Sequence, residues 1–174
     1  MAGNKKPTKK YRPKGVRLNT VDYVRQGLAP LSKNLRVNLL TKVHDAMVEV
    51  TQGRGTKTHW VLVADALNTA QVLDEQTFLA AYEVEFDLAH AAHAACGTRF
   101  INGKTMLYTG AELGAVNFAL QVHEEQLLKA TLSEVEHALN TVEARQRDPL
   151  RRRAILVGEG YVTTPDATSL LRKC

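Results

Sequence analysis

Aromatic residues and long apolar runs are scarce in this chain. Only 6% of its 174 residues are aromatic although 44% are hydrophobic, so Leu, Val and Ala must fill most of the core. No apolar run approaches the roughly 20 residues that a membrane-spanning helix needs. The lysines near the N-terminus are not followed by the apolar segment of a signal peptide. We therefore expect a soluble single-domain protein that makes no membrane contact.

Cysteines and serines are also few, which argues against several kinds of nucleophilic enzyme. The two cysteines, Cys96 and Cys174, allow one disulfide at most, and we expect instead reduced thiols in the cytoplasm of a bacterial host. No recognisable nucleophile motif surrounds Cys96. The serines lie in predicted cap or tail positions, at Ser32, Ser133 and Ser169. The sequence therefore predicts a protein that is not an enzyme and that needs no cofactor.

Apolar residues recur at helical spacing through most of the chain. We predict an all-α bundle of five or six helices: a short one over about 19–27, then 32–53, one from about 56, 76–95, 109–129 and 131–148. Ser32 is a predicted N-cap, and Thr109 with Glu112 fits a capping box. Thr131 with Glu134 fits a second box inside a long helical run, so we divide that run into two helices.

One short segment has the pattern of β structure. Asn102-Gly103 lies between two apolar runs, 100–101 and 106–108, and Asn-Gly is the preferred pair of a type I′ turn. We therefore predict one small β-hairpin near 99–108. A second apolar run at 154–157 is a candidate strand beside it.

The net charge of +5 divides unevenly along the chain. Residues 1–17 carry seven cations and no acid, whereas residues 18–144 carry nine basic and fifteen acidic residues, a net charge of −6. Residues 145–174 carry seven basic and three acidic residues, a net charge of +4. We predict a disordered, flexible basic arm over 1–17, a helical domain over 18–148 and a basic C-terminal tail over 149–174.

Both basic ends are candidate polyanion-binding sites. Their cations would neutralise phosphates and release counterions, and the one aromatic residue of the arm would stack on a base. The alternatives are a solubilising tail and an arm that folds back on the acidic body. The candidate residues are Lys5, Lys6, Lys9, Lys10, Tyr11, Arg12, Lys14, Arg151, Arg152 and Arg153. Arg145 and Arg147 extend the second cluster and also suit the negative end of a helix dipole.

Acids and histidines at helical spacing suggest a metal site as an alternative. Asp87 with His90, and Glu134 with His137, have the spacing of the two halves of a carboxylate-bridged di-metal site. Glu83 shares the face of the first pair, and further ligands would come from His93, Glu49 and Glu124. We expect ordinary surface or core histidines with neighbouring acids, and therefore no metal.

Three stretches carry a resemblance to known proteins. They are Lys-Lys-Tyr-Arg-Pro-Lys at 9–14, Thr-Gly-Ala-Glu-Leu at 109–113 with its continuation through Val122-His123, and Leu-Ser-Glu-Val-Glu-His-Ala-Leu at 132–139. Together they resemble small basic helical accessory proteins of prophages and mobile elements of Gram-negative bacteria. The resemblance implies an origin and no functional residue. Such accessory proteins are regulators, nucleic-acid binders or inhibitors of host complexes, including CRISPR-type defence systems.

These observations favour a non-enzymatic phage or mobile-element accessory protein that binds and inhibits or remodels a host protein or nucleoprotein complex. An acidic helical body suits a basic partner, such as a protein that itself grips nucleic acid. The first alternative is a direct DNA- or RNA-binding regulator that uses the basic arm. The second alternative is a helical metalloenzyme.

Overall fold

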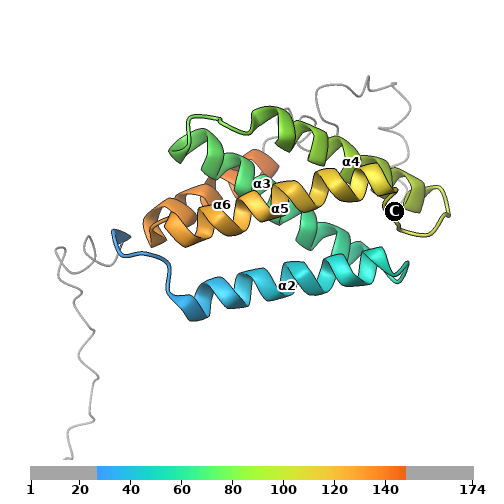
Figure 1. Cartoon of the computed structure of the whole chain (residues 1–174), viewed down its shortest axis with the longest axis horizontal. Helices are drawn as coiled ribbons and strands as arrows, with labels where there is room; N and C mark the ends of the chain where they lie inside the picture. The colour runs from blue at the N-terminus through green and yellow to red at the C-terminus, as the bar shows by residue number, and fades with distance from the viewer. Residues whose placement is uncertain (1–26, 148–174) are drawn as a thin grey trace, which may run out of the picture.

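The computed structural model describes residues 27–147, which form five α-helices and no strand (Figure 1). The helices are α2 (Lys33–Thr51), α3 (Lys57–Thr77), α4 (Glu83–Ile101), α5 (Gly110–Lys129) and α6 (Leu132–Arg147). The predicted all-α class is therefore confirmed for this part of the chain. The basic arm, nearly all of the predicted helix over 19–27, the candidate strand at 154–157 and the basic tail lie outside the described residues.

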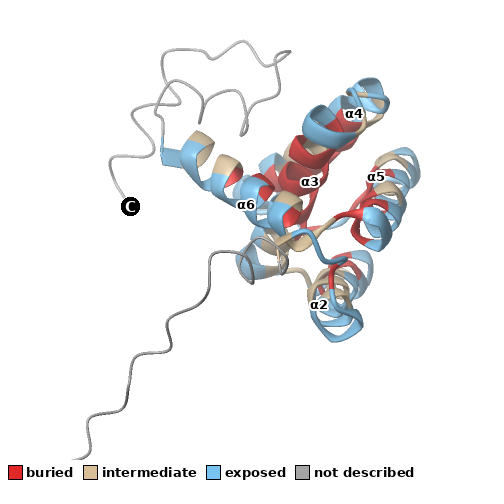
Figure 2. Cartoon of the chain, turned by 90° about the vertical axis from the view of Figure 1, so that its left-hand side faces the viewer, coloured by how far each residue is buried: buried red, intermediate tan, exposed pale blue. Residues whose placement is uncertain are grey.

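Helix α3 is the centre of the bundle. It packs against α2, α4, α5 and α6, and Figure 2 shows its buried surface enclosed by the other four helices. Val63 and Leu67 of α3 belong to one apolar cluster with Phe86 of α4, while Leu73 belongs to a second cluster with Val135 of α6. Among the described helices, none has the length and apolar character that crossing a membrane requires.

The helix starts follow the predicted caps. Ser32 Oγ accepts a hydrogen bond from the Leu35 amide, at 3.3 Å. Thr109 and Glu112 form the reciprocal capping box of α5. The Thr131 amide donates to Glu134 Oε2 at 2.7 Å, and the Glu134 amide donates to Thr131 Oγ1 at 3.3 Å. The predicted division of the run at Thr131 is therefore confirmed.

The predicted β-hairpin at 99–108 is wrong. Helix α4 continues through Gly97 to Ile101, and Asn102-Gly103 ends it instead of turning between strands. The Gly103 amide donates to Phe100 O and the Lys104 amide to Arg99 O, both at 3.0 Å, which is the paired pattern of a Schellman motif. Gly103 has a φ of +76°, as this motif requires.

An ion pair, and no strand pairing, fixes the connection from α4 to α5. The Arg99 guanidinium donates to both carboxylate oxygens of Glu112, at 2.7 and 2.5 Å, and to the Leu107 carbonyl at 2.9 Å. This arrangement holds the pKa of Glu112 below its usual range, chiefly through the Arg99 hydrogen bonds. Arg99 in the last turn of α4 is thus bound both to the connection, at Leu107, and to the first turn of α5, at Glu112.

The helix predicted for 76–95 is also placed wrongly. Helix α3 continues to Thr77, a turn occupies 78–82, and α4 begins at Glu83. Leu79 and Ala80 in that turn have positive φ angles of 58° and 54°. Neither residue type favours this conformation, so the local sequence carries no turn signal.

Candidate functional site

The predicted polyanion-binding residues are not placed by the structure. The ten candidates Lys5, Lys6, Lys9, Lys10, Tyr11, Arg12, Lys14, Arg151, Arg152 and Arg153 all lie outside the described residues. Arg145 and Arg147 are described, and both form ion pairs on α6. Arg145 pairs with Glu75 of α3 and Arg147 with Glu143, each at 2.5 Å. Arg145 therefore joins α6 to α3, whereas Arg147 pairs within α6 itself.

The two predicted halves of a metal site are not brought together. Asp87 and His90 lie on α4, whereas Glu134 and His137 lie on α6, and the Glu134 carboxylate caps that helix. No group of three or more His, Cys, Asp or Glu side chains within residues 27–147 has an arrangement that could hold a metal ion. The di-metal hypothesis therefore has no geometric basis in the described part of the chain.

A buried polar cluster joins α3, α4 and the connection to α5. His93 Nδ1 lies 2.6 Å from the Tyr108 hydroxyl, and His93 Nε2 lies 3.0 Å from the Trp60 carbonyl oxygen. The indole N–H of Trp60 donates to the His93 carbonyl at 3.1 Å, and the two rings stack with centroids 4.6 Å apart. His93 and Tyr108 are buried, so this cluster holds the fold together and offers no surface to a ligand.

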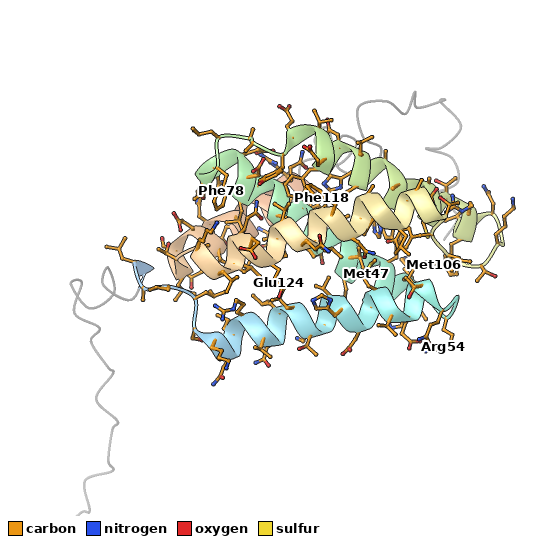
Figure 3. The ribbon with its side chains drawn as sticks, viewed as in Figure 1. Met47, Arg54, Phe78, Met106, Phe118 and Glu124 are labelled. Carbon is orange, nitrogen blue, oxygen red and sulfur yellow. The ribbon has the colours of Figure 1, made fainter. Side chains whose placement is uncertain are left out.

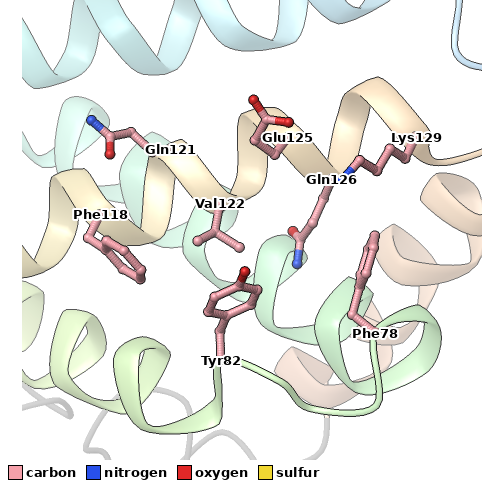
Figure 4. Close-up of a pocket in the computed structure, with 8 residues that line it drawn as sticks. All are labelled: Phe78, Tyr82, Phe118, Gln121, Val122, Glu125, Gln126 and Lys129. Atoms are coloured by element: carbon pink, nitrogen blue, oxygen red, sulfur yellow. The ribbon is translucent and has the colours of Figure 1, made fainter.

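The described surface does contain a pocket, at the corner where α3, α4 and α5 meet (Figure 4). Its volume is about 230 Å³. Phe78, Tyr82 and Phe118 supply aromatic walls, and the rings of Tyr82 and Phe118 meet edge to face with centroids 6.2 Å apart. Phe78 and Tyr82 come from the 78–82 turn and Phe118 from α5. The remaining lining residues are Gln121, Val122, Glu125, Gln126 and Lys129, all on α5.

Asp74 holds the turn that carries two of these aromatic residues. Its carbonyl oxygen accepts hydrogen bonds from the Phe78 and Ala80 amides, both at 3.0 Å. Its Oδ2 accepts a hydrogen bond from the Tyr82 amide at 2.9 Å. Burial raises the pKa of Asp74, and the Tyr82 amide partly opposes that rise. A buried carboxylate with its backbone partners thus keeps Leu79 and Ala80 in an unfavourable conformation, at a cost of about 1–2 kcal/mol for each residue.

Gln126 contributes a buried polar group to the pocket. Its side chain is 3% exposed, and Nε2 donates to the Ala70 carbonyl of α3 at 3.2 Å. Oε1 has no hydrogen-bond partner within the described residues. The same side chain partly opposes the burial that lowers the pKa of His123 to about 4. Because Oε1 is itself fully buried and lies near the His123 ring, it belongs to the packing of α5 against the core and is closed to a ligand.

The surroundings of the pocket are apolar and acidic. Leu79 is 92% exposed beside it, and the wall residues Tyr82 and Phe118 remain 38% and 43% exposed. We define the acidic margin as Glu83 and Glu85, which follow Tyr82, and Glu125 in the pocket lining. None of these three acids forms an ion pair within residues 27–147. Lys129 offsets the charge of Glu125 in the lining itself, so the arrangement suits a large apolar side chain, and a cation beside it would have to face Glu83 or Glu85.

The helix predicted for 76–95 includes both Phe78 and Tyr82, so the prediction missed the turn between them and with it the pocket. The turn contains no Gly, Pro or Asn that would have indicated it. The closely spaced aromatic residues were the one sequence feature that pointed to this region. Comparison of the chain with known protein families, curated proteins and solved structures finds no match.

Proposed function

We propose that this chain is a non-enzymatic binding protein that inhibits or remodels a host protein or nucleoprotein complex. In this proposal it is a phage or mobile-element accessory protein, and a CRISPR-type defence complex is an example of its target. The observation that carries the proposal is the partly exposed aromatic pocket with its acidic margin. The mobile-element origin is supported by the sequence resemblance alone.

The chemistry of the pocket indicates what kind of protein it would recognise. Interfaces depend on a few aromatic or arginine anchors that fill pockets, and truncating one such hot spot to Ala costs about 2 kcal/mol or more. Unpaired acids around the anchor attract cations and speed association. The partner would therefore present a large apolar side chain among Lys and Arg residues. A protein that binds nucleic acid has a surface rich in Lys and Arg of this kind.

A capture experiment with matched phenylalanine variants tests the proposal. Phe118 and Phe100 are 43% and 37% exposed, but Phe100 lies near the C-terminal end of α4 and does not line the pocket. We expect tagged full-length protein and Phe100→Ala to retain the same partner from a nuclease-treated Gram-negative lysate. Phe118→Ala should recover at least tenfold less of this partner, because truncating a hot spot costs about 2 kcal/mol or more and about 1.4 kcal/mol already corresponds to a tenfold loss of affinity. Equal recovery by the two variants, or no partner after nuclease treatment, would contradict the proposal.

The charge of residues 1–17 favours a second candidate, a direct DNA- or RNA-binding regulator. Seven cations without an acid would bind a bare duplex with an affinity that falls steeply as salt rises. Deleting residues 1–17 should abolish this binding. An affinity that survives the deletion unchanged would exclude the arm as the nucleic-acid site.

A further inference from the structure

The chain itself contains a segment that matches the pocket. We propose that residues 9–14 of the basic arm dock in the aromatic pocket of the same molecule, with Tyr11 as the anchor, and that this docking competes with the partner. The competition rests on the proposed function, whereas the docking does not. The arm would then be a built-in regulator of partner binding.

The first support is the place where the arm joins the described structure. The Leu31 amide donates to the Ala130 carbonyl at 3.3 Å, and the Leu132 amide donates to the Ala29 carbonyl at 3.0 Å. These bonds pin residues 29–31 against the connection between α5 and α6. Lys129, which lines the pocket, directly precedes that connection. Residues 29–31, the last of which comes fourteen positions after the end of the arm, are therefore fixed beside the edge of the pocket that Lys129 forms.

The second support is the length of chain outside the described residues. Gly27 comes sixteen positions after Tyr11. The predicted helix over 19–27 spans about 12 Å, and the eight positions from Tyr11 to Asn19 add about 14–17 Å as a flexible coil and at most about 29 Å when fully extended. The α5 wall of the pocket runs from Phe118 to Lys129, eleven positions that extend about 16 Å along a helix. Tyr11 can therefore reach any part of the pocket without stretching its linker.

The third support is chemical complementarity. Tyr11 is the only aromatic residue among residues 1–17, and cations surround it at positions 9, 10, 12 and 14. Its ring would pack against Phe118 and Tyr82, as aromatic pairs do. The flanking cations would face the acidic margin.

The size of the pocket also suits one side chain. Its volume of about 230 Å³ is below the roughly 300–1,000 Å³ of sites for small molecules. A flexible tether of this kind gives a local concentration in the millimolar range. If the segment binds with a Kd near 1 mM, about half of the molecules are docked, and the arm weakens partner binding about twofold.

Photo-crosslinking in the full chain tests the docking. The reagent is p-azidophenylalanine at position 11, because it is close to tyrosine in size, and the products are mapped by mass spectrometry. We expect crosslinks within one molecule to residues 78–82 or 118–129, in a yield that does not change on tenfold dilution. The yield should fall at least twofold in Phe118→Ala and in Glu125→Gln. It should also fall at 1 M salt, where the screening length is only about 3 Å.

Glu124 supplies the matched control for Glu125. It carries the same charge, but Figure 3 shows it on the side of α5 that faces α2, away from Phe78 and Phe118. Glu124→Gln should leave the crosslink yield unchanged. Crosslinks between two molecules, crosslinks to other surfaces, or equal effects of the two Gln variants would overturn the docking.

The affinity of the partner separates this inference from the proposed function. Deleting residues 1–17 should raise the affinity of purified partner about twofold. If Phe118→Ala abolishes partner binding but position 11 gives no crosslink to the pocket, the docking is wrong and the proposed function stands. If the crosslink forms as expected but no protein partner binds, the proposed function is wrong and the docking stands.

Discussion

His93 in its neutral form makes a hydrogen bond through each of its ring nitrogens, and this form also gives the proton of the Tyr108 hydroxyl an acceptor. Nε2–H donates to the Trp60 carbonyl at 3.0 Å, which leaves Nδ1 to accept from the Tyr108 hydroxyl at 2.6 Å. Burial lowers the pKa of His93 to about 4, and the Trp60 carbonyl partly opposes this. Burial also raises the pKa of Tyr108, so that the hydroxyl keeps its proton. These three residues therefore form a closed, uncharged network.

Removing the Tyr108 hydroxyl tests that network. Tyr108→Phe leaves the buried Nδ1 without a donor, and we expect the free energy of unfolding to fall by about 1–3 kcal/mol in urea titrations. Tyr82→Phe is the control, because no hydrogen bond of the Tyr82 hydroxyl is seen within residues 27–147 and its ring is partly exposed. That variant should stay within about 0.5 kcal/mol of the wild type. Equal losses in the two variants would contradict the role assigned to the hydroxyl.

The two buried histidines make stability depend on pH. Burial lowers the pKa of His93 and of His123 to about 4. The unfolded value is about 6.5. A depressed folded pKa stabilises the protein above the unfolded value, and this stability is lost as the pH falls from about 6.5 towards 4. Each histidine contributes up to about 3 kcal/mol, since one pKa unit corresponds to about 1.4 kcal/mol.

Urea titrations at pH 7, 5.5 and 4 check this dependence. We expect the free energy of unfolding to fall by several kcal/mol over that range. His123→Leu should remove only the His123 share of this dependence, because His93 remains and burial lowers the pKa of His90 as well. A stability that is equal at pH 7 and pH 4 would exclude buried neutral histidines.

The backbone of the 78–82 turn is strained, because Leu79 and Ala80 have positive φ angles, and substitution can test this strain. Ala80 has a φ of 54°, which costs an alanine about 1–2 kcal/mol. Ala80→Gly should therefore raise the free energy of unfolding by about 1 kcal/mol, as measured in urea. The same substitution in the exposed part of α6, Ala144→Gly, should lower it by about 1 kcal/mol. Two changes of the same sign would contradict the strain.

The sequence predicted those helix ends that side chains determine. Ser32, Thr109 and Thr131 cap α2, α5 and α6 as expected, because a capping hydrogen bond depends on residues only three positions apart. The Thr131 box even separates two helices whose apolar pattern is continuous. Local chemistry was sufficient at these three positions.

Two predictions, the hairpin at 99–108 and the helix over 76–95, were wrong because tertiary contacts determine the backbone there. Asn102-Gly103 suits a type I′ turn and a Schellman motif equally well. Which of the two forms depends on whether α4 continues past Gly97. An added Cβ at Gly97 would lie 2.7 Å from Trp60 Nε1, so this glycine allows the close packing of α4 against Trp60 and does not end the helix. The turn at 78–82 depends on the buried Asp74, which lies outside it. The pocket was missed because that turn creates it.

At the scale of the whole molecule, the separation of charge connects the arm to the acidic body. Residues 27–147 carry ten basic and fourteen acidic residues, a net charge of −4, whereas the arm carries seven cations. An arm held in the pocket has fewer cations available for phosphates. Docking and nucleic-acid binding should therefore compete, and weakening one should strengthen the other.

Phenylalanine variants reveal this competition without changing any charge. Fluorescence anisotropy of a labelled duplex at low salt should show about twofold tighter binding for Phe118→Ala than for the wild type, because releasing an arm that is docked about half of the time doubles its availability. Phe100→Ala should bind like the wild type. In chains that lack residues 1–17, the two variants should bind equally weakly, since no arm remains to be released. If Phe118→Ala binds the duplex no more tightly than Phe100→Ala in the full chain, then the pocket does not hold the arm.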